Sequence, residues 1–230
     1  MIIINNSQLK ELSKNQLNGN WKLPIIITLI YLLISIFISF VEGIVYSGTL
    51  VGVLTIISFM IGVWSTVGIP KFYLEFIKDN RKVQLTDALV SLQILGKSLL
   101  YNIIIGIITF IILIIAIGIT VFSIDNTGIL FFIRFIISMS IYVGFIILAI
   151  GWSQAPYIIV ENNIGVIESM KISMKMMKGY KLKYFTLGLS FIGWAILSIL
   201  TLGIGFLWLI PYINLTFANF YKDICSDFII

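Results

Sequence analysis

The sequence predicts an all-α fold: a polytopic transmembrane helix bundle of about six spans, with amphipathic interfacial helices on the cytoplasmic side. Hydrophobic residues make up 60% of the 230-residue chain and charged residues only 11%, with a mean hydropathy of +1.10. Soluble domains carry about 25% charged residues. Long intervals also lack charge, and the basic residues gather in a few of the segments between them. One core of this size could not bury so much apolar surface, so lipid must cover much of it.

The first four spans are predicted from intervals almost free of charge, each long enough to cross a hydrocarbon layer of about 30 Å. The second span is expected to end near Gly68 and Pro70, because proline removes a helical hydrogen bond. These spans lie near residues 23–41, 47–70, 98–122 and 129–152.

Residues 1–22 precede the first span and predict a short interfacial helix. Ser7 is placed to cap this helix at its N-terminus. Its leucines recur at helical spacing, so they are expected to lie on the bilayer surface. These leucines are Leu9, Leu12 and Leu17.

The interval from Tyr184 to Tyr221 decides the number of spans. It holds 38 residues without a charge, and as one helix it would be roughly 57 Å long, nearly twice the hydrocarbon thickness. Two spans near 184–201 and 204–221 fit better, joined at Thr201–Gly205, where two glycines permit a tight turn. A re-entrant hairpin is the alternative. The whole chain, 1–230, is then a single integral membrane domain.

The charge distribution predicts a multi-pass protein of the cell membrane with both termini in the cytoplasm. With the N-terminus inside, the inner segments hold 14 of the 15 basic residues. The expected outer loops hold Glu42 and Asp125 and neither lysine nor arginine. This excess of positive charge inside also supports an even number of spans.

The inner segment Ile164–Lys183 has the clearest amphipathic pattern, with Gly179 placed at its helix end. An apolar face is formed by Ile167, Met170, Met174 and Met177, and a basic face by Lys171, Lys175 and Lys178. One interpretation is a helix lying flat, with methionines at the acyl boundary and lysines towards anionic lipid headgroups. A helix that packs two spans together at the cytoplasmic rim is favoured over one that holds a mobile protein partner.

The last predicted span carries a stripe of polar-tipped side chains on one face, with Pro211 beside it. The stripe consists of Trp208, Tyr212, Thr216 and Asn219. Polar groups in lipid normally face the protein interior, where they bond to other helices or line a wet cavity. Interhelical hydrogen bonding is favoured, and a ligand pathway is the alternative.

Arg134 is the one charge placed well inside a span, which makes it a candidate for an intramembrane polar site. It lies close to the outer end of the fourth span. Snorkelling, or pairing with Asp125 or Glu42, is therefore the favoured interpretation.

Several classes of function find no support in the sequence. The chain has no histidine, and Cys225 is its one cysteine, so the commonest general base, the commonest metal ligand and a thiolate cluster are missing. No catalytic or phosphate-binding motif is present. We expect no enzyme activity, no cofactor, no bound metal and no nucleic-acid partner. A weak repeat, Pro70 to Glu75 and Pro156 to Glu161, leaves internal duplication open.

The C-terminal third contains four short motifs: 177-MKGYK-181, 189-LSFIGW-194, 201-TLGIGFLWLIPY-212 and 218-ANFY-221. Near the start, the run Leu17-Asn18-Gly19-Asn20-Trp21 follows a short polar helix. With these motifs the chain resembles the bacterial integral membrane proteins classed as domain of unknown function 975. The resemblance implies a multi-span bacterial membrane protein and brings no catalytic residues.

The expected function is therefore non-enzymatic. We expect action through a membrane protein partner, as an accessory subunit of a transport or export system or as an immunity-type protein. The alternative is a small-molecule carrier or substrate-binding membrane component with a site near the last span. An intramembrane enzyme acting on lipid is the least favoured interpretation.

Overall fold

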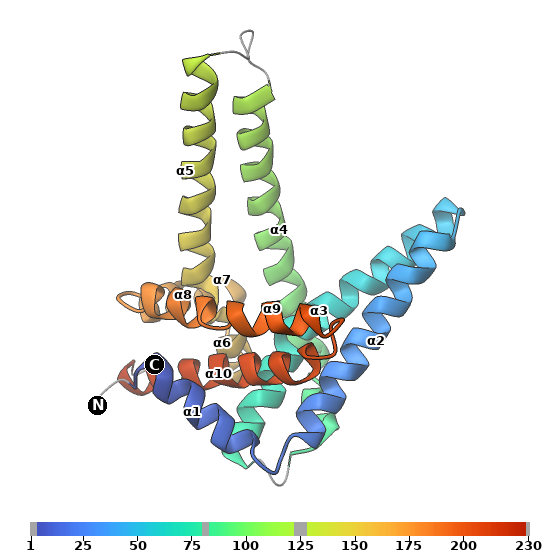
Figure 1. Cartoon of the computed structure of the whole chain (residues 1–230), viewed down its shortest axis with the longest axis vertical. Coiled ribbons are helices and arrows are strands. Elements are labelled where there is room, and N and C mark those ends of the chain that lie inside the picture. Colours follow the sequence, from blue (N-terminus) through green and yellow to red (C-terminus); the bar gives the residue numbers. More distant parts are fainter. Residues whose placement is uncertain (1–3, 80–82, 122–127, 229–230) are drawn as a thin grey trace.

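The computed structural model describes residues 4–79, 83–121 and 128–228, and this part of the chain is helical throughout, which confirms the all-α prediction. Figure 1 labels the helices along the chain. They are α1 (Asn6–Leu17), α2 (Lys22–Ile44), α3 (Gly48–Lys78), the 3₁₀ helix η1 (Leu85–Ala88), α4 (Leu92–Val121), α5 (Ile129–Trp152), α6 (Ala155–Asn162), α7 (Val166–Met176), α8 (Lys181–Leu189), α9 (Ile192–Leu200) and α10 (Phe206–Asp227).

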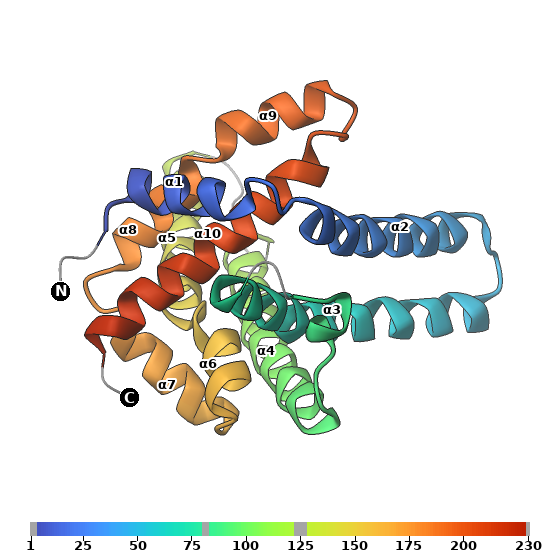
Figure 2. The ribbon, with the colours of Figure 1, turned by 90° about the horizontal axis from the view of Figure 1, so that it is seen from below.

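Two helical hairpins project from one end of the molecule. One is formed by α2 and α3 and the other by α4 and α5, and they diverge away from the end at which the two termini lie (Figure 1). We call these hairpins the arms. Helices α8, α9 and α10 lie crosswise to α4 and α5 (Figure 1). In the view turned by 90°, α8 and α10 are again seen from the side (Figure 2).

Five helical stretches among the described residues are long and apolar enough to cross a membrane. They are Lys22–Ile44, Gly48–Lys78, Leu92–Ile119, Phe131–Asn162 and Lys181–Leu200. The first three lie in α2, α3 and α4, and the fourth runs through α5 and α6. The helix predicted at 129–152 has those bounds. The last predicted span, 204–221, is not among the five.

Helix α3 does not end near Gly68 and Pro70 but continues to Lys78, so that boundary was wrong. The residues after the proline include Phe72 and Phe76, which are fully buried. Their packing outweighs the hydrogen bond that proline removes. A Cβ at Gly68 would lie 2.8 Å from the Ala88 carbonyl oxygen, so a glycine here allows η1 to approach α3 closely.

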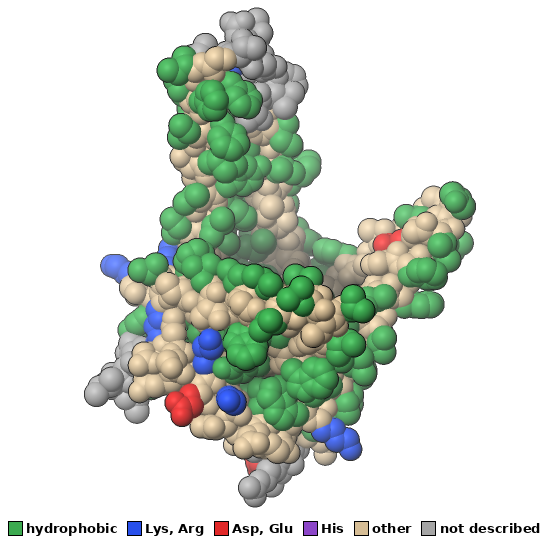
Figure 3. Space-filling view, in the orientation of Figure 1, with side chains coloured by type: hydrophobic (Ala, Val, Ile, Leu, Met, Phe, Trp, Pro, Cys, Tyr) green, Lys and Arg blue, Asp and Glu red, His purple; other side chains and the backbone are tan. Residues whose placement is uncertain are grey.

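The base is the packed end of the molecule from which the arms project. It comprises α1, the end of α3 from Val67 to Lys78, α6, α7, α8 and α10. Three apolar clusters fill it, and Tyr157 of α6 stacks on Tyr221 of α10 with ring centroids 5.0 Å apart. Figure 3 shows lysine side chains around this end and hydrophobic side chains along the arms. The base therefore has a protein core of its own, while the arms expose their apolar surface.

Candidate functional site

Helix α1 packs against α10 rather than lying alone on a bilayer surface. Asn5, not Ser7, caps it. The Asn5 side-chain oxygen accepts a hydrogen bond from the Gln8 backbone N–H, and the Gln8 side-chain oxygen accepts one from the Asn5 backbone N–H. Leu9 and Leu17 are 0% exposed. The prediction that these leucines lie on the bilayer was wrong, because the same apolar stripe suits a protein surface equally well.

Polar side chains of α10 join the two helices. The Tyr212 hydroxyl donates to the Lys10 carbonyl oxygen at 3.2 Å. The Asn219 amide nitrogen donates to the Ser13 hydroxyl at 2.8 Å and to the Gln16 side-chain oxygen at 2.7 Å. Since Asn219 is only 4% exposed, these bonds satisfy a buried donor that would otherwise be costly.

The predicted stripe on α10 is thus divided between two environments. Thr216 is fully buried, and its hydroxyl donates to the Tyr212 carbonyl oxygen at 2.7 Å within the same helix. Asn219 packs against α1. Trp208 is 48% exposed and, with Tyr212, lines a groove. The structure therefore places Asn219 in the contact with α1, Trp208 at the groove and Tyr212 in both, while Thr216 is buried and bonds within α10.

Helix α1 is also fastened to α8. The Asn6 amide nitrogen donates to the Lys183 carbonyl oxygen at 3.2 Å and to the Thr186 hydroxyl at 3.0 Å. Lys183 in turn forms a salt bridge of 2.9 Å with Asp223 of α10, and both side chains are largely buried. Helices α1, α8 and α10 therefore form one hydrogen-bonded unit.

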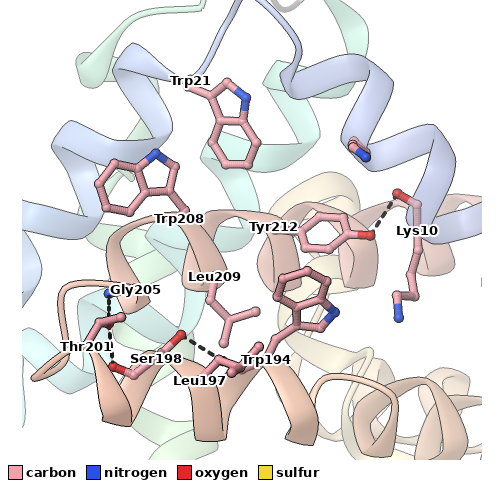
Figure 4. A pocket seen from close by; sticks show the side chains of 11 residues that line it. Lys10, Trp21, Trp194, Leu197, Ser198, Thr201, Gly205, Trp208, Leu209 and Tyr212 are labelled. Atoms are coloured by element: carbon pink, nitrogen blue, oxygen red, sulfur yellow. Dashed lines mark hydrogen bonds between the residues drawn. The ribbon is translucent and has the colours of Figure 1, made fainter.

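A groove of roughly 510 Å³ lies between α1, α9 and α10. Figure 4 shows the indole rings of three tryptophans and the Tyr212 ring around it, with Lys10 on the side of α1. Its lining residues are Lys10, Lys14, Trp21, Trp194, Leu197, Ser198, Thr201, Gly205, Trp208, Leu209 and Tyr212. No acidic residue is among them, so the groove is apolar and aromatic with two cationic side chains.

The turn between α9 and α10, where the sequence predicted a break, contributes Thr201 and Gly205 to the groove. Leu202 and Gly203 adopt left-handed conformations, with φ of 54° and 87°. The Gly205 amide donates to the Thr201 hydroxyl at 2.9 Å. A Cβ at Gly205 would lie 2.8 Å from the Ser198 Cα, so this glycine allows the two helix backbones to approach closely.

Of the groove residues, only Trp208 and Tyr212 were predicted as members of a site. The residues missed by the sequence reasoning are Lys10, Lys14, Trp21, Trp194, Leu197, Ser198 and Leu209. The tryptophans were one signal in the sequence that could have pointed to this groove, because three of the five in the chain line it. Tryptophan is enriched at the level of lipid headgroups. Their convergence could not be read from the sequence, since 173 positions separate Trp21 from Trp194.

Helix α7 is amphipathic as predicted, but its methionines do not face lipid. Met170 is 6% exposed and Met177 0%, both packed in the base, while Ile167 is exposed. The acyl-boundary prediction was wrong for these two methionines, because α5 and α6 cover that face. The lysines of α7, Lys171, Lys175 and Lys178, are exposed and border a shallow depression with Met174 and Lys181.

Arg134 lies on α5 and is partly exposed. Its predicted partner Asp125 is outside the described residues. The other candidate partner, Glu42, accepts a hydrogen bond of 3.4 Å from the Thr55 hydroxyl within the α2–α3 arm. The structure does not bring Arg134 to the groove, so the predicted polar residues do not form one site.

The described part of the chain contains few clusters of side chains that could bind a metal ion or react. Over residues 4–79, 83–121 and 128–228, no group of three or more cysteine, aspartate or glutamate side chains is arranged to hold a metal ion. Cys225 is a free thiol, and burial raises its pKa. The groove is therefore suited to binding an apolar or amphiphilic molecule.

Comparison with known proteins gives one positive result. The family model described as "Protein of unknown function (DUF975)" matches residues 1–227. No curated protein and no solved structure matches the chain.

Proposed function

Since the chain belongs to the DUF975 family, whose description states no activity, we propose a function from the geometry of this chain alone. The protein is a multi-pass, non-enzymatic protein of the cell membrane that acts by binding a membrane protein partner through its arms. The observation that carries this proposal is the contrast in burial: the base has a packed core, while the arm helices expose most of their apolar side chains.

The arms favour a partner-binding protein over a carrier. A carrier encloses its substrate path between repeats or helix bundles near the bilayer midplane. Here the two arms diverge (Figure 1), and the groove lies between α1, α9 and α10 rather than between the arms. Helices in a membrane associate through close packing with other helices, and the open arms offer such surfaces to a partner.

We propose four spans, α2 to α5, with α8, α9 and α10 at the cytoplasmic interface, in place of the six spans predicted. Helix α1 carries exposed Glu11 and Lys14, so it belongs in the headgroup layer. It contacts α10 at Tyr212, which is only about 9 Å along the helix from Phe206 at the helical rise of about 1.5 Å per residue. A segment this short reaches into one leaflet and does not cross a layer of about 30 Å.

Helices α8 and α9 are limited to one leaflet in the same way. Helix α8 is bonded to α1 through Lys183 and Thr186, so it shares the depth of α1. Helix α9 has nine residues, about 14 Å of helix. The α9–α10 hairpin then dips into the inner leaflet, and four spans still place both termini in the cytoplasm.

Cysteine labelling in intact cells tests this topology. In a Cys225→Ser background, Asn126→Cys should react with a membrane-impermeant maleimide from outside, because the sequence places it in an outer loop. Thr201→Cys, at the tip of the hairpin, should stay unlabelled from outside. Equal external labelling of both positions would support six spans and refute the interfacial hairpin.

Photo-crosslinking tests the partner. A photoreactive amino acid at exposed arm positions, Ile57 on α3 and Ile107 on α4, should give a protein adduct of discrete mass in cell membranes. The same group at Lys175 of the base is the control and should give none. If every exposed position on both arms yields lipid adducts alone, the partner-binding proposal is overturned.

The groove favours a second candidate, a membrane component that binds a small amphiphilic molecule beside α10. Trp208 and Tyr212 belong to the stripe from which that alternative was predicted, and both line the groove. If this candidate is right, a ligand binds in the groove, and the photo-crosslinking positions on the arms give no protein adduct.

A further inference from the structure

The groove between α1, α9 and α10 combines a cationic side with an aromatic and apolar remainder. Lys10 and Lys14 project from α1, and Leu197 and Leu209 contribute aliphatic surface from α9 and α10. A volume of roughly 510 Å³ falls within the range of about 300–1,000 Å³ typical of sites for small ligands. The lining suits a molecule that is anionic at one end and apolar along the rest.

The two lysines keep their positive charge available. The Lys10 amine lies 3.3 Å from the Ser190 hydroxyl and 4.9 Å from the centre of the Phe191 ring, both neutral groups. Neither Lys10 nor Lys14 forms a salt bridge within the described residues. An anion at this position would therefore meet two cations that no carboxylate of the described chain neutralises.

The rim of the groove is apolar and suited to contact lipid. Trp194 and Leu197 are more than half exposed, and the hairpin tip beyond them exposes Leu200 and Leu202. These positions carry no charge, so they prefer hydrocarbon to water. A ligand can therefore enter sideways from the leaflet with its apolar portion never leaving an apolar environment.

We propose that this groove binds one anionic phospholipid of the leaflet in which α1 lies. Lys10 and Lys14 hold the phosphate region of the headgroup. Trp21, Trp194 and Trp208 lie at the level of the glycerol backbone, and an acyl chain follows Leu197 and Leu209. The proposal rests on the interfacial placement of α1 and the α9–α10 hairpin, which the Thr201→Cys labelling decides separately, and it does not depend on a protein partner for the arms.

Tryptophan fluorescence offers a direct test. Replacing Trp64 and Trp152 by phenylalanine leaves only the three groove tryptophans as fluorophores. The protein is placed in nanodiscs that contain either brominated phosphatidylglycerol diluted in unlabelled phosphatidylcholine or the reverse mixture. Bromine quenches on contact, so the two titrations give the relative affinity of the site for the anionic and the zwitterionic lipid.

We expect roughly a thirtyfold preference for phosphatidylglycerol, equivalent to about 2 kcal/mol, because each of the two lysines contributes about 1 kcal/mol towards an anionic lipid near a membrane surface. In Lys10→Gln/Lys14→Gln the preference should fall to within about twofold of unity. Lys171→Gln/Lys175→Gln removes the same charge from α7, outside the groove, and should keep the preference. Equal quenching by the two lipids in the parent, or equal loss in both double variants, overturns the proposal.

A second readout needs no tryptophan replacement. The wild-type chain, extracted from mixed-lipid membranes and analysed by native mass spectrometry, should retain one phosphatidylglycerol molecule. Lys14→Gln alone should reduce that retained fraction severalfold without unfolding the protein, since the Lys14 side chain is exposed and forms no salt bridge within the described residues. Retention of phosphatidylcholine instead, or unchanged retention in Lys14→Gln, would contradict the assignment.

Discussion

Phe72, Leu187 and Phe220 in the base are covered by other side chains, whereas Phe110, Phe132 and Ile136 on the α4–α5 arm are more than 60% exposed. The base gains its stability from contacts between parts of the protein, as a soluble domain does. The arms expose apolar side chains. Lipid covers these side chains as well as a neighbouring helix would, because lipid tails are equally apolar. The stability of the base therefore depends on packing within the protein, whereas the stability of the arms depends on the lipid around them.

A pair of phenylalanine truncations should give the largest difference between the two regions. Phe220→Ala removes a fully buried ring that lies 5.4 Å from the Tyr184 ring, and such changes cost about 3–5 kcal/mol. Phe110→Ala removes a ring that is 62% exposed on the arm, and its cost should stay within about 0.5 kcal/mol. Thermal unfolding in nanodiscs measures both, and equal losses would show that the arms are packed against each other.

The turn of the α9–α10 hairpin supplies the next test. Gly205→Ala forces a Cβ to within 2.8 Å of the Ser198 Cα, and overpacking of this kind costs about 1–3 kcal/mol. Gly193→Ala, in the first turn of α9, meets no atom within 4 Å and should be neutral or stabilising by up to about 1 kcal/mol. The yield and melting temperature of the purified variants give the comparison. A neutral Gly205→Ala would mean that α9 and α10 do not approach as closely as described.

The contact between α1 and α10 supplies a third test, with an expected effect of similar size. Asn219→Leu removes two hydrogen bonds and leaves the Gln16 oxygen without this donor, which costs about 1–3 kcal/mol. Thr216→Val removes a bond within a single helix and should cost less than about 1 kcal/mol. Limited trypsin digestion should cut at Lys14 faster in Asn219→Leu, because α1 detaches more often. Similar cleavage rates in both variants would argue against α10 as the anchor of α1.

The smallest effect concerns the Cys225 thiol. Burial raises its pKa, so the reactive thiolate is scarcer in the folded base than in an exposed cysteine at the same pH. Alkylation at pH 7 should be slower than in denatured protein and should accelerate as the pH rises through the raised pKa. Because the unfolded thiol ionises first, stability should fall slightly above the ordinary thiol pKa. Rapid labelling of native protein at pH 7 would place Cys225 at the surface.

The sequence predicted the arms better than the base. Apolar intervals with few or no charges record where a helix meets lipid, and the prediction at 129–152 matched α5. A proline inside α3 misled the prediction, since buried Phe72 and Phe76 keep the helix intact beyond Pro70. Hydropathy registers a local preference, and packing over long distances along the chain decides the rest.

The candidate site was only half accessible to prediction. The α10 stripe was found because its polar tips recur at helical spacing. Its partner α1 was identified as a helix, but its leucines fit lipid and protein equally well, and the sequence alone does not say which. The groove depends on Lys10, Trp194 and Trp208 converging from three helices, and no periodicity within one segment records that.

The bond between Tyr212 and Lys10 joins residues 202 positions apart, and this has a consequence for biogenesis. Helix α1 leaves the ribosome long before α10 is synthesised, since translation proceeds at about 5–20 residues per second. During that delay Leu9 and Leu17 have no protein surface to cover them, so the nascent helix must rest on the membrane or on a chaperone. The arms can insert one after the other, but the base closes only when the C-terminal helix arrives. Quality control that senses an undocked α1 would therefore detect chains that stop before α10.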